Sequence, residues 1–121
     1  MNCLFVGVGG FLGALLRYLL GLISVNENNV FPLKTFLINI SGCLLIAIIT
    51  MIAGKHINID QKWILFLKVG FCGGFTTFST FALETTELIK SGHVIIAFIY
   101  MLLSVFVGCA IVFGVEYLFI K

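Results

Sequence analysis

The chain has 121 residues, of which 61% are hydrophobic and only 10% are charged. A water-soluble domain of this composition could not cover its surface with polar side chains, so the composition indicates a membrane protein. Seven basic against five acidic residues give a net charge of +2, too weak and too dispersed for a basic stripe along a phosphate backbone. Nucleic-acid binding is therefore excluded, and a soluble enzyme is nearly excluded.

Charge and turn signals mark four hydrophobic stretches, at 3–24, 32–54, 62–90 and 93–120. Each is long enough to cross a hydrocarbon core of about 30 Å as a helix. The aromatic residues Tyr18, Trp63 and Tyr117 lie near the ends of stretches, as expected of an aromatic belt at the membrane interface. The sequence therefore predicts an all-α integral membrane protein, with a single four-span domain over residues 1–121.

The third stretch is unlike the others, because a straight helix over its length would measure about 43 Å, more than the hydrocarbon core needs. Its middle, GFCGGFTTFSTF at 70–81, holds glycines and hydroxyls at the depth where polar backbone is most costly to expose. Unwound backbone is tolerated there only beside protein or a water-filled cavity, so we predict a helix broken at mid-membrane, at a functional centre. The alternative is a helix whose glycines pack against a neighbouring helix.

Polar residues inside the spans are few, and nearly all of them can donate hydrogen bonds. Outside the third stretch they include Thr35, Asn39 and Ser41 in the second, and Tyr100 and Ser104 on one face of the fourth. The acidic residues of the third and fourth stretches lie toward their ends, at Glu84, Glu87 and Glu116. A cation pathway would normally place a carboxylate at depth, so this lining favours an anion as the transported ion.

Phenylalanine rings offer a second source of positive potential, because an aromatic ring carries a positive edge. We expect Phe78 and Phe81 to share one helical face with Phe71 and Phe75, where their edges could attract a small anion. Plain packing is the alternative, since 13 of the 121 residues are Phe. Asn39 has two interpretations as well, a hydrogen bond between helices or a contact with an ion.

The first stretch carries small residues at helical spacing and one charge. Gly9 and Gly13 are four residues apart, as are Gly70 and Gly74 in the third stretch, and such pairs predict close helix packing without indicating a function. Arg17 lies seven residues before the end of the first stretch, from which its side chain can extend outward or reach a vestibule.

Three motifs follow one another along the first three stretches. They are GGFLGALLRY at 9–18, TFLINISG at 35–42 and GFCGGFTTFSTF at 70–81. In this order and at these separations they resemble the Fluc fluoride-channel family, also called CrcB. The resemblance agrees with the chain length and the number of spans, and the third motif is long and unusual enough to be highly specific.

The resemblance implies a passive, fluoride-selective channel and not an enzyme. Such a channel exports fluoride across the cytoplasmic membrane, lowers its toxicity, and is built as an antiparallel, dual-topology homodimer with two pores. The positions that would form the fluoride pore are Phe78 and Phe81, through their ring edges, with Asn39, Thr80, Tyr100, Ser104 and, at a vestibule, Arg17. Gly73 and Thr76 would supply backbone carbonyls to a structural sodium ion between the two broken helices.

The sequence departs from the family pattern at three positions that bear on the polar track of the fourth helix and on the third motif. Gly108 stands where a hydroxyl is often found, Ala82 follows the motif where serine is common, and Phe75 replaces a smaller residue.

Other functions remain as alternatives. A small multidrug-type transporter has four spans and dual topology, but it needs a deep carboxylate in its first span, where this chain has none. A non-conducting structural protein would explain the glycines and phenylalanines but not Asn39, Thr76 and Ser104 at depth. Proton-coupled fluoride exchange is disfavoured by the lack of a buried acidic couple.

The distribution of basic residues is nearly even between the two sides of a four-span arrangement. Lys55, Lys62, Lys68 and Lys121 can reach one side, and Arg17, Lys34 and Lys90 can reach the other. A bias of four against three is too small for the positive-inside rule to fix one orientation. Charge counting therefore predicts dual topology as well.

Overall fold

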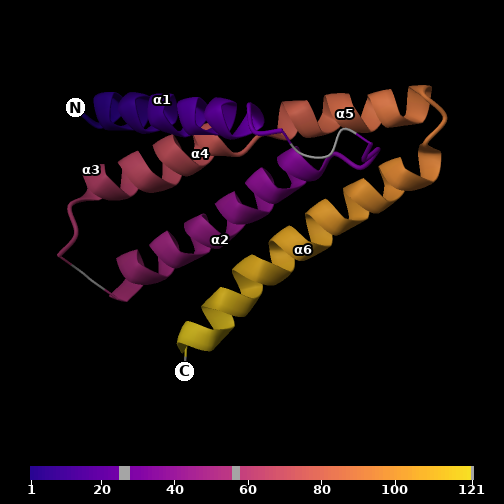
Figure 1. The fold of residues 1–121 in the computed structure, drawn as a ribbon. Helices are drawn as coiled ribbons and strands as arrows, with labels where there is room; N and C mark the ends of the chain where they lie inside the picture. Colours follow the sequence, from indigo (N-terminus) through magenta and orange to yellow (C-terminus); the bar gives the residue numbers. More distant parts are fainter. Residues whose placement is uncertain (25–27, 56–57, 121) are drawn as a thin grey trace.

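The structure is a computed structural model that describes residues 1–24, 28–55 and 58–120, and helices joined by short connections make up this part of the chain (Figure 1). The elements are α1 (Asn2–Gly21), α2 (Leu33–Lys55), α3 (Gln61–Ile64), the π-helix η1 (Leu65–Cys72), α4 (Gly73–Phe75), α5 (Phe78–Lys90) and α6 (Val94–Ile120). Four helical segments are long and apolar enough to cross a membrane: α1, α2, the run Gln61–Lys90, and α6. The predicted all-α, four-span fold is confirmed. Lys121, which was included in the count of basic residues, lies outside the described residues.

Helix α1 packs along the first half of the third span, which comprises α3, η1 and α4 (Figure 1). The approach is close enough that a Cβ at Gly13 would overlap the carbonyl oxygen of Phe71, and one at Gly74 would overlap that of Gly10. Glycine is required at these two positions because backbone meets backbone without a side chain between. The small-residue pairs of the first and third stretches therefore lie in the helix contact that they predict.

The other helices form a second group, in which α2 packs against α6, and α5 packs against the first turns of α6. The buried core of this group is Leu88, Ala97 and Tyr100, against which Phe31, Phe36, Phe81 and Ile96 pack. Gly108 is buried where α6 meets α2, and a Cβ there would lie 3.2 Å from the Cys43 sulfur. The position that departs from the family pattern thus lies in a helix contact.

The third span is broken at Thr76 and Thr77, as predicted. Both residues are extended, with φ/ψ of −85°/158° and −147°/120°. Helix α5 then starts afresh at Phe78, because the Thr77 side chain accepts a hydrogen bond from the backbone N–H of Thr80 and so caps the new helix. The span thus has both features that the sequence offered as alternatives, glycine packing in its first half and a break at its centre.

The break corrects the expectation that four phenylalanines share one helical face. Phe71 and Phe75 stack on each other before the break, with ring centroids 5.9 Å apart, whereas Phe78 and Phe81 pair after it at 5.8 Å. Because the two extended residues interrupt the helical periodicity, the two pairs belong to separate helices.

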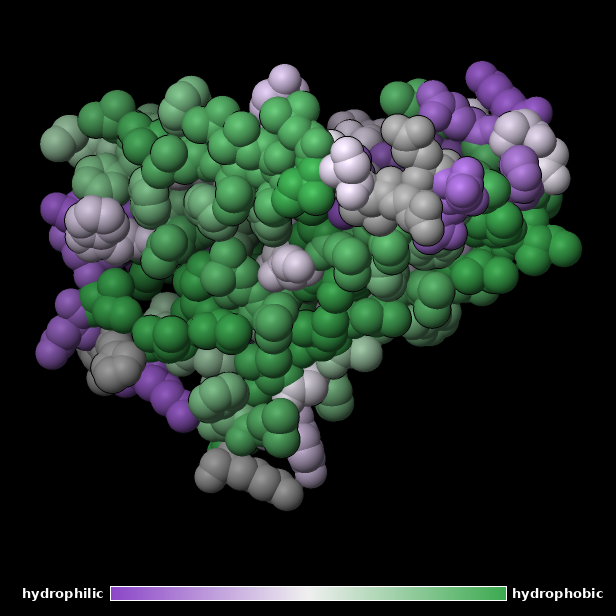
Figure 2. Space-filling model, viewed as in Figure 1, coloured by the Kyte–Doolittle hydropathy of each residue, from purple (hydrophilic) through white to green (hydrophobic). Residues whose placement is uncertain are grey.

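The surface is that expected for a chain surrounded by lipid. In Figure 2, hydrophobic residues cover the middle of the visible face and hydrophilic residues gather toward its ends. Large apolar side chains of α6 are open to the surroundings, such as Phe106 at 67% and Phe113 at 71% exposure. Exposed rings of this size within a span fit a hydrocarbon environment.

Candidate functional site

The side chain of Asn39, on α2, holds the backbone of the break. Its Nδ2 donates to the carbonyl oxygen of Thr77 over 3.1 Å, and the Thr77 N–H donates to its Oδ1 over 2.8 Å. One amide side chain thus satisfies both backbone groups of an extended residue, in the way a neighbouring strand would. Of the two interpretations that the sequence allows for Asn39, the structure displays the hydrogen bond between helices.

This pairing leaves two carbonyls of the third span without their usual helical donors. In a continuous helix, the N–H groups of Thr77 and Thr80 would donate to the carbonyls of Gly73 and Thr76. Here the first donates to Asn39 and the second to the Thr77 hydroxyl. The break therefore presents backbone oxygens at the centre of the span, where a polar ligand can be held.

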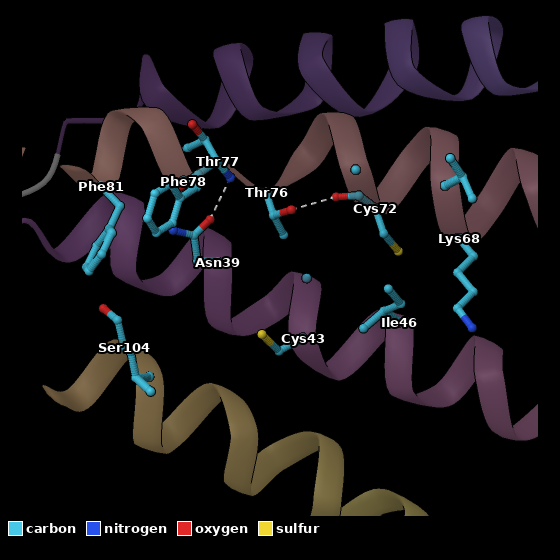
Figure 3. Close-up of a pocket in the computed structure, with 14 residues that line it drawn as sticks. Asn39, Cys43, Ile46, Lys68, Cys72, Thr76, Thr77, Phe78, Phe81 and Ser104 are labelled. Carbon is cyan, nitrogen blue, oxygen red and sulfur yellow. Dashed lines mark hydrogen bonds between the residues drawn. The ribbon is translucent and has the colours of Figure 1, made fainter. Parts of the chain in front are cut away.

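A cavity of about 500 Å³, which we call the central cavity, lies between α2, the third span and α6 (Figure 3). Its lining residues are Asn39, Gly42, Cys43, Ile46, Lys68, Val69, Cys72, Gly73, Thr76, Thr77, Phe78, Phe81, Ser104 and Val105. Phe78, Phe81 and Ser104 lie at one end, and Lys68 lies at the other. The Ser104 hydroxyl oxygen is buried and has no hydrogen-bond partner among the described residues. It is therefore available to a ligand in the cavity.

A second cavity, of about 290 Å³, lies on the other side of the break, and we call it the vestibule cavity. Its lining residues are Arg17, Tyr18, Gly21, Leu22, Lys34, Thr35, Ile38, Thr77 and Thr80. Arg17 Nε donates to the carbonyl oxygen of Gly74 over 3.2 Å, and Lys34 Nζ donates to that of Gly21 over 2.9 Å. Two cations are thus held at this cavity, and Thr77 lines both cavities.

Tyr100 and Glu84 form a polar network behind Phe81. The Tyr100 hydroxyl donates to Glu84 Oε2 over 3.2 Å, and the Thr35 hydroxyl donates to Glu84 Oε1 over 2.5 Å. Tyr100 is fully buried, and its ring meets that of Phe81 edge-on with centroids 5.0 Å apart. Tyr100 lines neither cavity, so its place in a polar track stays a prediction.

Sequence reasoning missed Glu84 because it placed this residue in the last turns of one long helix. Since α5 begins only at Phe78, Glu84 lies in the second turn of a new helix, close to the break. The break was itself predicted, so the signal was present. A helix that restarts at Phe78 places Glu84, six positions later, close to the break.

The charges at the two cavities are of one sign. Arg17, Lys34 and Lys68 line them, and among the described residues no carboxylate does. The described residues also hold no cluster of His, Cys, Asp and Glu that could bind a metal ion. A broken span with a cationic cavity on each side defines the chain as a small membrane protein of the channel or transporter class, with sites suited to anions.

Comparison with known proteins agrees with this class. The model of the family described as CrcB-like protein, Camphor Resistance (CrcB), matches residues 4–115, so the chain belongs to the CrcB family. Curated relatives bear the name fluoride-specific ion channel FluC. The relative from Azobacteroides pseudotrichonymphae is 39% identical over 88% of this chain and 86% of its own length, and that from Flavobacterium psychrophilum is 42% identical over 86% and 85%. FluC 1 from Bacillus thuringiensis is 44% identical over 93% and 82%.

Proposed function

We propose that this multi-pass membrane protein is a fluoride channel, and not an enzyme, that carries fluoride passively out of the cell across the cytoplasmic membrane. The observation that carries the proposal is the lining of the two cavities, with three cations, several hydroxyls and, among the described residues, no carboxylate. The relatives, which are named as fluoride-specific ion channels, supply the identity of the anion. A deep carboxylate in the first span, which the multidrug-type alternative needs, is missing from the sequence.

The proposed path joins the vestibule cavity to the central cavity past the break. Arg17 and Lys34 attract the anion, and the hydroxyls of Thr77 and Thr80 begin to replace its water. The ring edges of Phe78 and Phe81 then stabilise it, and the unpartnered Ser104 hydroxyl donates to it. Selectivity follows because fluoride, the smallest halide, gains most from short hydrogen bonds in a narrow path.

We further propose that two chains form the functional unit as an antiparallel, dual-topology homodimer. Phe78 is 79% exposed although it lies at the centre of a span beside polar backbone. Gly73 is exposed as well, and a Cβ there would meet nothing within 4 Å of its own chain. A second copy would cover both, and the near-even distribution of basic residues supports opposed orientations.

A sodium ion at Gly73 and Thr76 fits the backbone described above. Their carbonyls have lost the N–H groups that a helix would provide, and both residues line the central cavity. Carbonyl oxygens freed by unwinding favour a monovalent cation. The ion would supply a positive charge that compensates these oxygens in a water-poor environment. Because the backbone supplies the ligands, the side chain of Thr76 is free to donate to the Cys72 carbonyl, as it does over 2.8 Å.

Efflux from liposomes tests the proposed function directly. Purified protein is reconstituted with fluoride and chloride inside, and each ion is followed outside with its own electrode while a potassium ionophore balances the charge. We expect rapid fluoride release with chloride retained. Equal release of both anions would refute selectivity, and fluoride release that requires a proton gradient would refute the passive channel.

A further inference from the structure

Lys68 is a cation inside the third span that the proposed path has not used. It is half-buried in η1 and lies at the end of the central cavity opposite to Phe78 and Phe81 (Figure 3). Within the described residues it has no hydrogen bond, ion pair or ring contact, whereas Lys34 bonds a carbonyl and Lys62 pairs with Asp60. Its ammonium group is therefore free to bind a ligand.

Lys68 lies at a depth in the span where an ammonium group without a partner costs free energy. It lies seven residues into the span, about 10 Å of helix from Gln61. Ionisable residues at such depth usually face a cavity or a charged partner. Its neighbours in the cavity wall include Ile46 and Cys72, which are uncharged and largely apolar. Low-dielectric walls concentrate the field of a single charge, so the ligand that this end favours is a small anion.

We propose that Lys68 forms an anion site at this end of the central cavity, which holds fluoride one step away from the Phe78 and Phe81 rings. The inference rests on the proposed function and adds a residue to it. Arg17 and Lys34 attract the anion on one side of the break, and Lys68 provides the corresponding attraction on the other. The buried hydroxyl of Ser104, which has no partner among the described residues, lies at the opposite end of the cavity and is a donor for an anion that has left Lys68.

The test compares fluoride efflux from liposomes for the full chain and its variants, at low ionic strength and low fluoride concentration. One charge acting over about 10 Å of partly hydrated cavity changes the local anion concentration roughly three- to fivefold, so Lys68→Gln and Lys68→Met should slow efflux by about that factor. Lys68→Arg keeps the charge and should keep the rate. Lys68→Glu reverses the charge and should slow efflux more than either neutral variant.

Salt dependence separates an electrostatic role from a structural one. A large impermeant organic salt screens the charge, so the difference between the wild type and Lys68→Gln should shrink as this salt is added. Lys62→Gln is the matched control, because that lysine lies in the same span but pairs with Asp60 outside both cavities, and its rate should be unchanged.

The outcomes distinguish this inference from the proposed function. A wild type that releases no fluoride would overturn both. If the wild type releases fluoride and both Lys68→Gln and Lys68→Met release it as fast as the wild type, the anion site alone is overturned. Lys68→Arg as slow as Lys68→Gln, or a difference that salt leaves unchanged, would show that the side chain acts through packing and would likewise overturn the site.

Discussion

The two hydrogen bonds between the Asn39 side chain and the Thr77 backbone, which we call the Asn39 clamp, lead to the sharpest prediction. It concerns the substitution Asn39→Leu. Leucine branches at the same carbon as asparagine but can form neither of the two hydrogen bonds to the Thr77 backbone. The freed N–H of Thr77 then has a competing acceptor, the carbonyl of Gly73, to which it would donate in a continuous helix. We expect the break to shift toward helix and the Gly73 carbonyl to be withdrawn from the central cavity.

The magnitude follows from the groups left unpaired. A buried polar group without its partner costs about 1–3 kcal/mol, so losing both bonds with no relaxation would cost about 2–6 kcal/mol. Side-chain hydrogen bonds between helices in membranes average only about 0.6 kcal/mol, because the separated helices find other partners. Here the alternative acceptor for the Thr77 N–H is the nearby Gly73 carbonyl, which it reaches if the helix becomes continuous. We therefore expect a loss of about 1–3 kcal/mol in the free energy of unfolding, together with loss of most fluoride flux.

Three measurements on Asn39→Leu check the reasoning. Thermal or steric-trapping unfolding in detergent gives the stability change, and efflux from liposomes gives the flux. The carbonyl ¹³C shift of Gly73, in selectively labelled protein, reports whether the helix has closed. Ser41→Ala is the control, because Ser41 is an exposed hydroxyl on the same helix, and it should change none of the three. Normal flux with an unshifted Gly73 carbonyl in Asn39→Leu would show that the clamp does not hold the break.

Three further predictions concern the rings, the glycines and the orientation. Phe81→Ile keeps an apolar side chain but removes the ring edge, so fluoride efflux should collapse while the protein elutes unchanged from a sizing column, and Phe106→Ile, on the lipid-exposed face, should be silent. Gly13→Ala forces a Cβ against backbone and should lower the unfolding free energy by about 1–3 kcal/mol, whereas Gly73→Ala should spare the single chain but weaken the dimer in analytical ultracentrifugation. Lysines added to the loop after α1 in one variant, and to the loop after α2 in another, should each fix one orientation. Co-expression should then restore efflux that neither variant shows alone, and full efflux from a single variant would contradict the antiparallel dimer.

The sequence predicted the break because local composition decides it. Glycines and hydroxyls at the centre of a span lower the cost of leaving the helix and supply a cap for the next one, and Thr77 does cap α5. The exact position of the break depends on a residue 38 positions away, since Asn39 reaches across from α2. Single-sequence reasoning finds the polar residue but cannot show which backbone groups it will meet.

The same limit explains what the sequence analysis missed. The prediction that four phenylalanines share one face assumed a continuous helix, which the break interrupts. Glu84 was assigned to the end of a span by counting, whereas its environment is set by Thr35 and Tyr100 on two other helices. Lys68 was counted only as a basic residue near an interface. Its position at the end of a cavity emerges only when α2 and α6 are placed beside η1.

The features that a single chain leaves incomplete all meet in the central cavity, which couples the proposed dimer to the proposed ion. Phe78 is exposed, Gly73 has open space before it, and the carbonyls of Gly73 and Thr76 lack helical donors. Two carbonyls do not complete the coordination shell of a monovalent cation, whereas the same two from an opposed copy would double the number. The same contact with a second copy would therefore cover the exposed ring and complete the cation site. It follows that the dimer should dissociate more readily when sodium is replaced by a large organic cation. Substitutions that open the dimer should abolish that dependence along with fluoride flux.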